Sequence, residues 1–195
     1  MASRRGHADV AQLLLKHGAD ADARDESFST WSTLERASFG GHVEVAQVLL
    51  EHGADVKAQG AFNYTPLHYA QGEDVTRVLL EHGADTNVLD SFGQPALHYA
   101  SRVGRVGTVR ALLEYGVDAN ARDAKNATPL RLACGAGWPD VARLLLQYGA
   151  DIHARDDEGQ TPFMIATENG YGDVMDLLLQ YGAEDHRTDS ESETS

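Results

Sequence analysis

The chain has 195 residues, a net charge of −14 and 42% hydrophobic residues. Nucleic acids and anionic membranes both need a positive protein surface, so this acidic balance argues against both as partners. No apolar run approaches the ~18 residues of a membrane span. The single cysteine, Cys134, excludes a disulfide within the chain.

A repeated unit is visible from its closing glycine. Each of six glycines is followed by Ala-Asp or a close variant, and they are spaced by 35, 30, 33, 33 and 33 residues. They are Gly18, Gly53, Gly83, Gly116, Gly149 and Gly182. A fixed period of this length indicates a repeat architecture, in which each unit buries its apolar face on its neighbours.

Residues 60–85 show what one unit contains. Thr65 is suited to cap a helix, and Pro66 follows at the first helical position, where a missing N–H costs nothing. Leu67 and Ala70 lie three apart and therefore share a face. A second helix is predicted from an i, i+3, i+4 apolar stripe, formed by Val75, Val78 and Leu79. We therefore expect two antiparallel helices and a projecting turn.

In chain order, residues 1–20 correspond to a second helix alone, which is half a unit. Because half a unit cannot cover its own apolar face, this stretch is either a minimal cap or part of a longer array. Full units are expected at about 21–55, 56–85, 86–118, 119–151 and 152–183. Residues 184–195 are acidic and contain no large apolar residue, so we expect a disordered tail.

Two units depart from the pattern. The first has two extra residues in its connecting turn, and its helix opens with Ser32 and Glu35 three apart, which predicts a capping box. The second is three residues short between Ala70 and Asp74, which removes nearly one turn from the end of its first helix. That loss is either a harmless deletion or a notch that shapes a ligand site.

The unit resembles the ankyrin repeat, whose signature is Thr-Pro-Leu-His-x-Ala at a period of 33 residues. Thr65–Ala70 match it in full, and related phrases recur at Ser32, Pro95, Thr128 and Thr161. The resemblance covers about residues 2–183. It implies an all-α solenoid of stacked helix–turn–helix units with projecting β-turns. It also implies binding of a partner protein on the concave face formed by turn tips and inner helices.

Catalytic and metal chemistry have little support in the sequence. All histidines but His186 recur at fixed positions of the unit, and the aspartate two residues after each closing glycine has a turn-forming role. Cys134 replaces a small core residue, so we expect a buried, inert thiol. We predict no catalytic residue, no cofactor, no metal site and no enzyme activity, because neither a phosphate-binding loop nor a nucleophile–base pair is recognisable.

Aromatic side chains stand at turn tips where this family usually has small or polar residues. Aromatic residues are preferred interface anchors, because they bury a large area at low entropy cost. Together with adjoining cations they form our predicted partner-binding set: Phe28, Trp31, Phe62, Tyr64, Phe92, Arg102, Arg105 and Lys125. The alternative is that these rings pack along neighbouring turns and stiffen them.

The predicted function is non-catalytic protein–protein recognition, as an adaptor or scaffold that binds a partner protein and is itself a monomer. The alternative is a recognition segment of a larger multidomain signalling protein or ubiquitin ligase. We expect no signal peptide, because no apolar run follows Arg4 and Arg5. The expected location is the cytoplasm, with the nucleus as the alternative.

Overall fold

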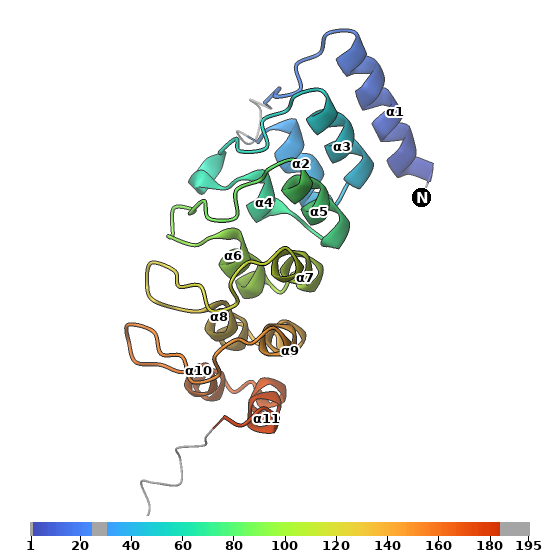
Figure 1. Cartoon of the computed structure of the whole chain (residues 1–195). Coiled ribbons are helices and arrows are strands. Elements are labelled where there is room, and N and C mark those ends of the chain that lie inside the picture. The colour runs from blue at the N-terminus through green and yellow to red at the C-terminus, as the bar shows by residue number, and fades with distance from the viewer. Residues whose placement is uncertain (1, 25–30, 184–195) are drawn as a thin grey trace, which may run out of the picture. The chain divides into compact units, whose positions relative to one another are not determined.

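The computed structural model describes residues 2–24 and 31–183 (Figure 1). This part of the chain is all-α, with eleven α-helices, one short 3-10 helix and no sheet. The elements are α1 (Ala2–Lys16), α2 (Thr33–Phe39), α3 (Val43–Glu51), η1 (Ala61–Asn63), α4 (Pro66–Tyr69), α5 (Glu73–Glu81), α6 (Ala96–Val103), α7 (Val106–Glu114), α8 (Pro129–Gly135), α9 (Pro139–Gln147), α10 (Pro162–Glu168) and α11 (Gly172–Gln180). None of these helices is both long and apolar enough to cross a membrane.

The helices form hairpins of an inner helix (α2, α4, α6, α8, α10) and an outer helix (α3, α5, α7, α9, α11). The chain divides into two compact units, Met1–Ala100 with Arg105–Val117 and Ser101–Gly104 with Asp118–Ser195. In the first unit, α2 packs on α3 and on α4, while α1, α3, α5 and α7 pack in succession. In the second unit, α8 packs on α9 and α10, and α11 packs on α9 and α10 (Figure 1).

Inner helices begin at side-chain caps. The hydroxyl of Ser32 accepts the N–H of Glu35 at 3.2 Å, and the Glu35 carboxylate accepts the N–H of Ser32 at 2.5 Å. This reciprocal pair confirms the predicted capping box. The hydroxyls of Thr128 and Thr161 each accept a backbone N–H three residues on, at 3.2 Å. These bonds satisfy donors that have no partner within the first turn of a helix.

The turns between hairpins follow the predicted pattern. Five aspartates, each two residues after a closing glycine, accept the backbone N–H two residues further on at 2.8–2.9 Å. They are Asp20, Asp55, Asp85, Asp118 and Asp151. The closing glycines have φ between 82° and 97°, a left-handed conformation that explains why glycine ends each outer helix.

The hydrophobic core follows the repeat. The central leucines of the inner helices are almost completely buried: Leu34, Leu67, Leu97 and Leu130. Cys134 is fully buried, as predicted, and this burial raises the pKa of its thiol to about 12. A protonated and inaccessible thiol is a poor nucleophile, so Cys134 acts as a small apolar core residue.

The three-residue deletion shortens α4 to four residues, against seven or eight in the other inner helices. The space at its end is occupied by the next hairpin. Arg105 Nη1 donates to the carbonyls of His68 and Ala70 at 2.9 and 3.2 Å, and the Thr108 hydroxyl donates to the carbonyl of Ala70 at 3.0 Å. Carbonyls that a full-length helix would satisfy internally are therefore satisfied by side chains.

Candidate functional site

The structure brings most of the predicted binding residues together. Trp31, Phe62, Tyr64, Phe92 and Arg105 all belong to the first compact unit. Two others, Arg102 and Lys125, belong to the second unit and are described there. Phe28 lies outside the described residues.

Seven aromatic rings of the first unit form a continuous network, which we call the aromatic cluster: Trp31, Phe39, Phe62, Tyr64, Tyr69, Phe92 and Tyr99. Its centre is Tyr69, whose ring centroid lies 4.3 Å from that of Trp31 and 5.3 Å from that of Tyr64. Tyr64 continues the network to Tyr99 at 4.9 Å. Most of these pairs are tilted or edge-to-face, the arrangements that ring quadrupoles favour.

The members of the cluster differ in exposure. Tyr69 is 5% exposed, whereas Phe62 and Phe92 are 62% and 58% exposed. The rings of Phe62 and Phe92 stack on each other with centroids 6.1 Å apart. Packing therefore accounts for the centre of the cluster. It leaves two large apolar rings in contact with water at the turn tips.

The backbone at this tip is unusual. Phe62 and Asn63 both have φ of 57°, in the left-handed region. Asparagine tolerates this conformation, but a bulky residue such as Phe62 rarely adopts it, at a cost of ~1–3 kcal/mol. Such strain is concentrated at binding and catalytic sites. The carbonyl of Phe62 accepts the N–H of Ser91 at 2.8 Å, which ties this tip to the next one.

Three rings of the cluster are not among the predicted binding residues: Phe39, Tyr69 and Tyr99. Phe39 ends α2, where the equivalent position in α8 is Gly135, and its ring lies 5.3 Å from Trp31. The predicted binding face includes the ends of the inner helices, so this aromatic substitution was a usable signal. Tyr99 is only partly buried and contacts both Tyr64 and the Arg105 guanidinium.

Arg105 joins the cluster from the N-terminal end of α7. Its guanidinium carbon lies 5.3 Å from the ring centroid of Tyr99 and 5.9 Å from that of Phe39. Burial lowers the pKa of Arg105, but a guanidinium stays charged in proteins. No carboxylate of the described residues pairs with it. The cluster therefore contains a positive charge without an acidic partner, and Nε and Nη2 remain available as donors.

Three junctions between hairpins can be compared. At each of these three, the residue three positions after the inner-helix cap faces a turn residue of the next hairpin. In the second compact unit this pair is Arg131 and Asp156, whose Nε and Oδ2 lie 2.7 Å apart. In the first unit, His68 Nε2 lies 3.1 Å from the carbonyl oxygen of Gln94, and the charge of Asp90 acts on the same ring.

The third junction has the opposite chemistry. At the position of His68 and Arg131 this junction has Glu35, which is fully buried. At the position of the turn aspartates it has Gly60. A Cβ at Gly60 would collide with the Glu35 carboxyl group. The other turn aspartates each accept two backbone N–H groups of their own turn. Without that carboxylate, the turn after Gly60 forms η1 and the left-handed tip at Phe62.

The pKa values of Glu35 and His68, at the two junctions of the first unit, are shifted in opposite directions. Burial raises the pKa of Glu35, although the Ser32 N–H and the charge of Arg24 partly oppose this. Burial lowers the pKa of His68 and thereby favours its neutral ring. Burial and the nearby Glu35 raise the pKa of Tyr69 to about 12. Around neutral pH the buried Tyr69 phenol and the neighbouring His68 imidazole are therefore uncharged.

The remaining predicted residues have local roles in the second unit. The carbonyl of Arg102 accepts the indole N–H of Trp138 at 3.1 Å, and the Trp138 ring packs on Gly104. Lys125 is exposed at a turn tip, where its N–H donates to Asp123 at 2.9 Å and its carbonyl accepts the N–H of Asp157 at 3.2 Å. Nothing in the described residues groups three potential metal ligands.

Comparison with protein families agrees with the repeat geometry. The family model described as "Ankyrin repeats (3 copies)" matches residues 1–60, 58–123 and 117–189. Comparison with curated proteins gave no match. The family match extends over nearly the whole chain, and the helix hairpins, glycine-ended outer helices and hydroxyl caps are those expected from the repeat. The chain therefore belongs to the ankyrin-repeat family, whose members are generally protein–protein interaction modules.

Proposed function

We propose that the chain is a non-catalytic adaptor or scaffold that binds a partner protein through the aromatic cluster, on the concave face of the solenoid. The observation that carries this proposal is the exposed pair Phe62 and Phe92, more than half exposed on a backbone with a left-handed phenylalanine. Exposed aromatic rings on a preorganised support are typical anchors of protein interfaces.

Arg105 suggests what the partner carries. Its guanidinium lies over two rings of the cluster, and no described carboxylate neutralises it. A partner segment with apolar side chains for Phe62 and Phe92, and an acidic group for Arg105, would match both features. An ion pair in such a partly buried site mainly adds specificity and orientation.

Affinity capture tests the proposal, with the wild-type chain compared with a Phe62→Ala, Phe92→Ala double variant. We expect captured partners to fall at least about tenfold with the double variant, because hot-spot aromatics contribute about 2 kcal/mol or more each. Tyr148→Ala is the matched control, since Tyr148 is a partly exposed aromatic residue at the end of α9. Equal capture by all three proteins would contradict the proposal.

A further inference from the structure

The turn that carries Phe62 differs in one informative way from a turn of the second unit. Residues 60–63 read Gly-Ala-Phe-Asn, and the equivalent residues 123–126 read Asp-Ala-Lys-Asn. Asn63 and Asn126 are both left-handed, with φ of 57° and 60°. Only the turn at 60–63 has a second left-handed residue, Phe62. The extra left-handed residue therefore occurs where glycine replaces the turn aspartate.

The turn aspartate explains the ordinary conformation. Asp90 Oδ1 accepts the N–H of Phe92 at 2.8 Å and that of Gln94 at 2.9 Å. Phe92 does not have a positive φ, so a phenylalanine at this place in a turn does not adopt the left-handed conformation by itself. Gly60 has no carboxylate to hold the N–H of Phe62, and the backbone forms the 3-10 helix η1 instead.

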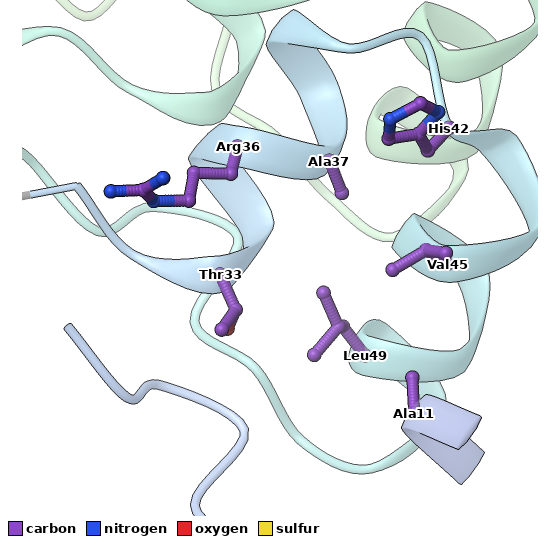
Figure 2. A pocket seen from close by; sticks show the side chains of 7 residues that line it. All are labelled: Ala11, Thr33, Arg36, Ala37, His42, Val45 and Leu49. Atoms are coloured by element: carbon purple, nitrogen blue, oxygen red, sulfur yellow. The ribbon is translucent and has the colours of Figure 1, made fainter. Parts of the chain in front are cut away.

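Glu35 explains the glycine at position 60. It belongs to α2, whose residues Thr33, Arg36 and Ala37 border a hollow together with residues of α1 and α3 (Figure 2). Glu35 does not line that hollow. Its carboxyl group is buried against Gly60, where a Cβ would collide with Oε1. Glu35 therefore disfavours any side chain at position 60, including that of aspartate.

Turn tips with and without the left-handed residue differ in what they contact. The rings of Phe62 and Phe92, on neighbouring turns, stack with centroids 6.1 Å apart. The equivalent side chains in the second unit are those of Lys125 and Glu158, and the ion pairs of the described residues do not join them despite their opposite charges. The backbone contact is the same in both cases, because the carbonyls of Phe62 and Lys125 each accept an N–H of the next turn. The stacked tips thus differ from the unstacked ones in the conformation of one residue.

We propose that Glu35 and Gly60 are positioning residues of the binding surface. Together they hold Phe62 in the left-handed conformation that places its ring on Phe92, and the partner binds this stacked pair as a unit. The inference rests on the proposed function of the aromatic cluster, and it adds two residues that act without touching the partner. Strain such as that at Phe62 persists only where the surrounding structure imposes it.

The test compares the wild-type chain with a Glu35→His, Gly60→Asp double variant. This variant gives the junction the ordinary pairing of a base with an aspartate and keeps both phenylalanines. We expect the NOEs between the Phe62 and Phe92 rings to disappear, together with the intense amide–Hα NOE that a positive φ gives to residue 62. Capture of the lysate proteins that bind the wild-type chain, measured by mass spectrometry, should fall at least about tenfold. A merely structural role would leave capture unchanged once stability is recovered.

Two variants of the second unit complete the test. Arg131→His is the matched control, because it places a histidine opposite Asp156 away from the aromatic cluster, and it should change neither the NOEs nor the capture. Arg131→Glu with Asp156→Gly transfers the pair to the second unit and should give residue 158 a positive φ. This last measurement tests the mechanism even if the first double variant does not fold.

The Phe62→Ala, Phe92→Ala variant separates this inference from the proposed function. If that variant loses capture while the Glu35→His, Gly60→Asp variant keeps it with its rings apart, the proposed function stands and the positioning role is wrong. If neither variant loses capture, both are wrong. The positioning role is also overturned if residue 62 stays left-handed in the Glu35→His, Gly60→Asp variant, or if the transferred pair leaves residue 158 unchanged.

Discussion

The carboxyl group of Glu35 packs against the backbone of Gly60, at a junction where the equivalent pairs place a base opposite an aspartate. Each of the three compared junctions thus contains one acidic residue. Asp90 and Asp156 lie in turns, whereas Glu35 lies in the helix α2. Two departures from the repeat, one in the helix and one 25 residues later, have a common physical reason: a side chain at position 60 would occupy the space of the Glu35 carboxyl.

Gly60→Asp is therefore expected to destabilise the chain by about 2–4 kcal/mol, since it places a second carboxylate against a buried one. Adding Glu35→His should recover most of that loss by recreating the arrangement of His68 and Asp90. Urea denaturation of the two single variants and the double variant measures the coupling, which we expect to be about 2 kcal/mol. Additive effects would show that the two positions are independent.

The two junctions predict opposite pH responses. The raised pKa of Glu35 gives stability that is fully present below its ordinary value of 4.5 and is lost as pH rises through the folded-state value. The lowered pKa of His68 gives stability that is present above 6.5 and is lost as pH falls through the folded-state value. Glu35→Gln should flatten the fall in unfolding free energy above pH 4.5, and His68→Gln should flatten the loss below pH 6.5. Unchanged pH profiles would refute the assignments.

Arg105→Ala should destabilise the first compact unit by about 1–3 kcal/mol, because the carbonyl of His68 loses its side-chain donor and that of Ala70 keeps only the Thr108 hydroxyl. Hydrogen exchange should show faster exchange in α4 and in the residues that follow it. Arg105→Lys keeps the charge but has no planar fork, so we expect partial recovery. Arg110→Ala, a partly exposed arginine of the same helix, is the control and should change stability little.

Cys134 should resist thiol reagents in the folded chain. Its thiol is fully buried with a pKa raised to about 12, so both access and thiolate are lacking. Labelling with a chromogenic disulfide should be slow at pH 8 and accelerate with urea in step with unfolding. Rapid labelling without denaturant would contradict the buried placement.

The sequence predicted the parts of this structure that repeat. The sequence alone was enough to predict the cap at Ser32, the aspartate turns and the burial of Cys134. Each of these follows from local hydrogen bonding or from a fixed position in the unit. The aromatic cluster was only partly readable. Trp31 and Tyr64 stood out at turn tips, but Phe39 and Tyr99 join them through contacts between hairpins, which local patterns do not encode.

The relation of Glu35 to Gly60 shows a similar limit. Each residue alone looks like an ordinary departure from the repeat, and only the packed hairpins bring the pair together. The same holds for Arg105, whose cationic character was noted but whose hydrogen bonds depend on the shortened α4. Glu35 and Gly60 are 25 positions apart, and His68 and Arg105 are 37 positions apart. Sequence patterns do not show that residues so far apart along the chain are in contact.

The shortness of α4 has a consequence for how the chain is made. Four residues are far fewer than the ~12–15 that an isolated helix needs in water, so α4 depends on the donors that Arg105 supplies. Arg105 follows His68 by 37 residues. At ~5–20 residues per second, a ribosome needs roughly 2–7 seconds to add them. During that interval the hairpin α4–α5 lacks the hydrogen bonds that Arg105 donates to it. We therefore expect α4 to become stable only after the ribosome has added Arg105.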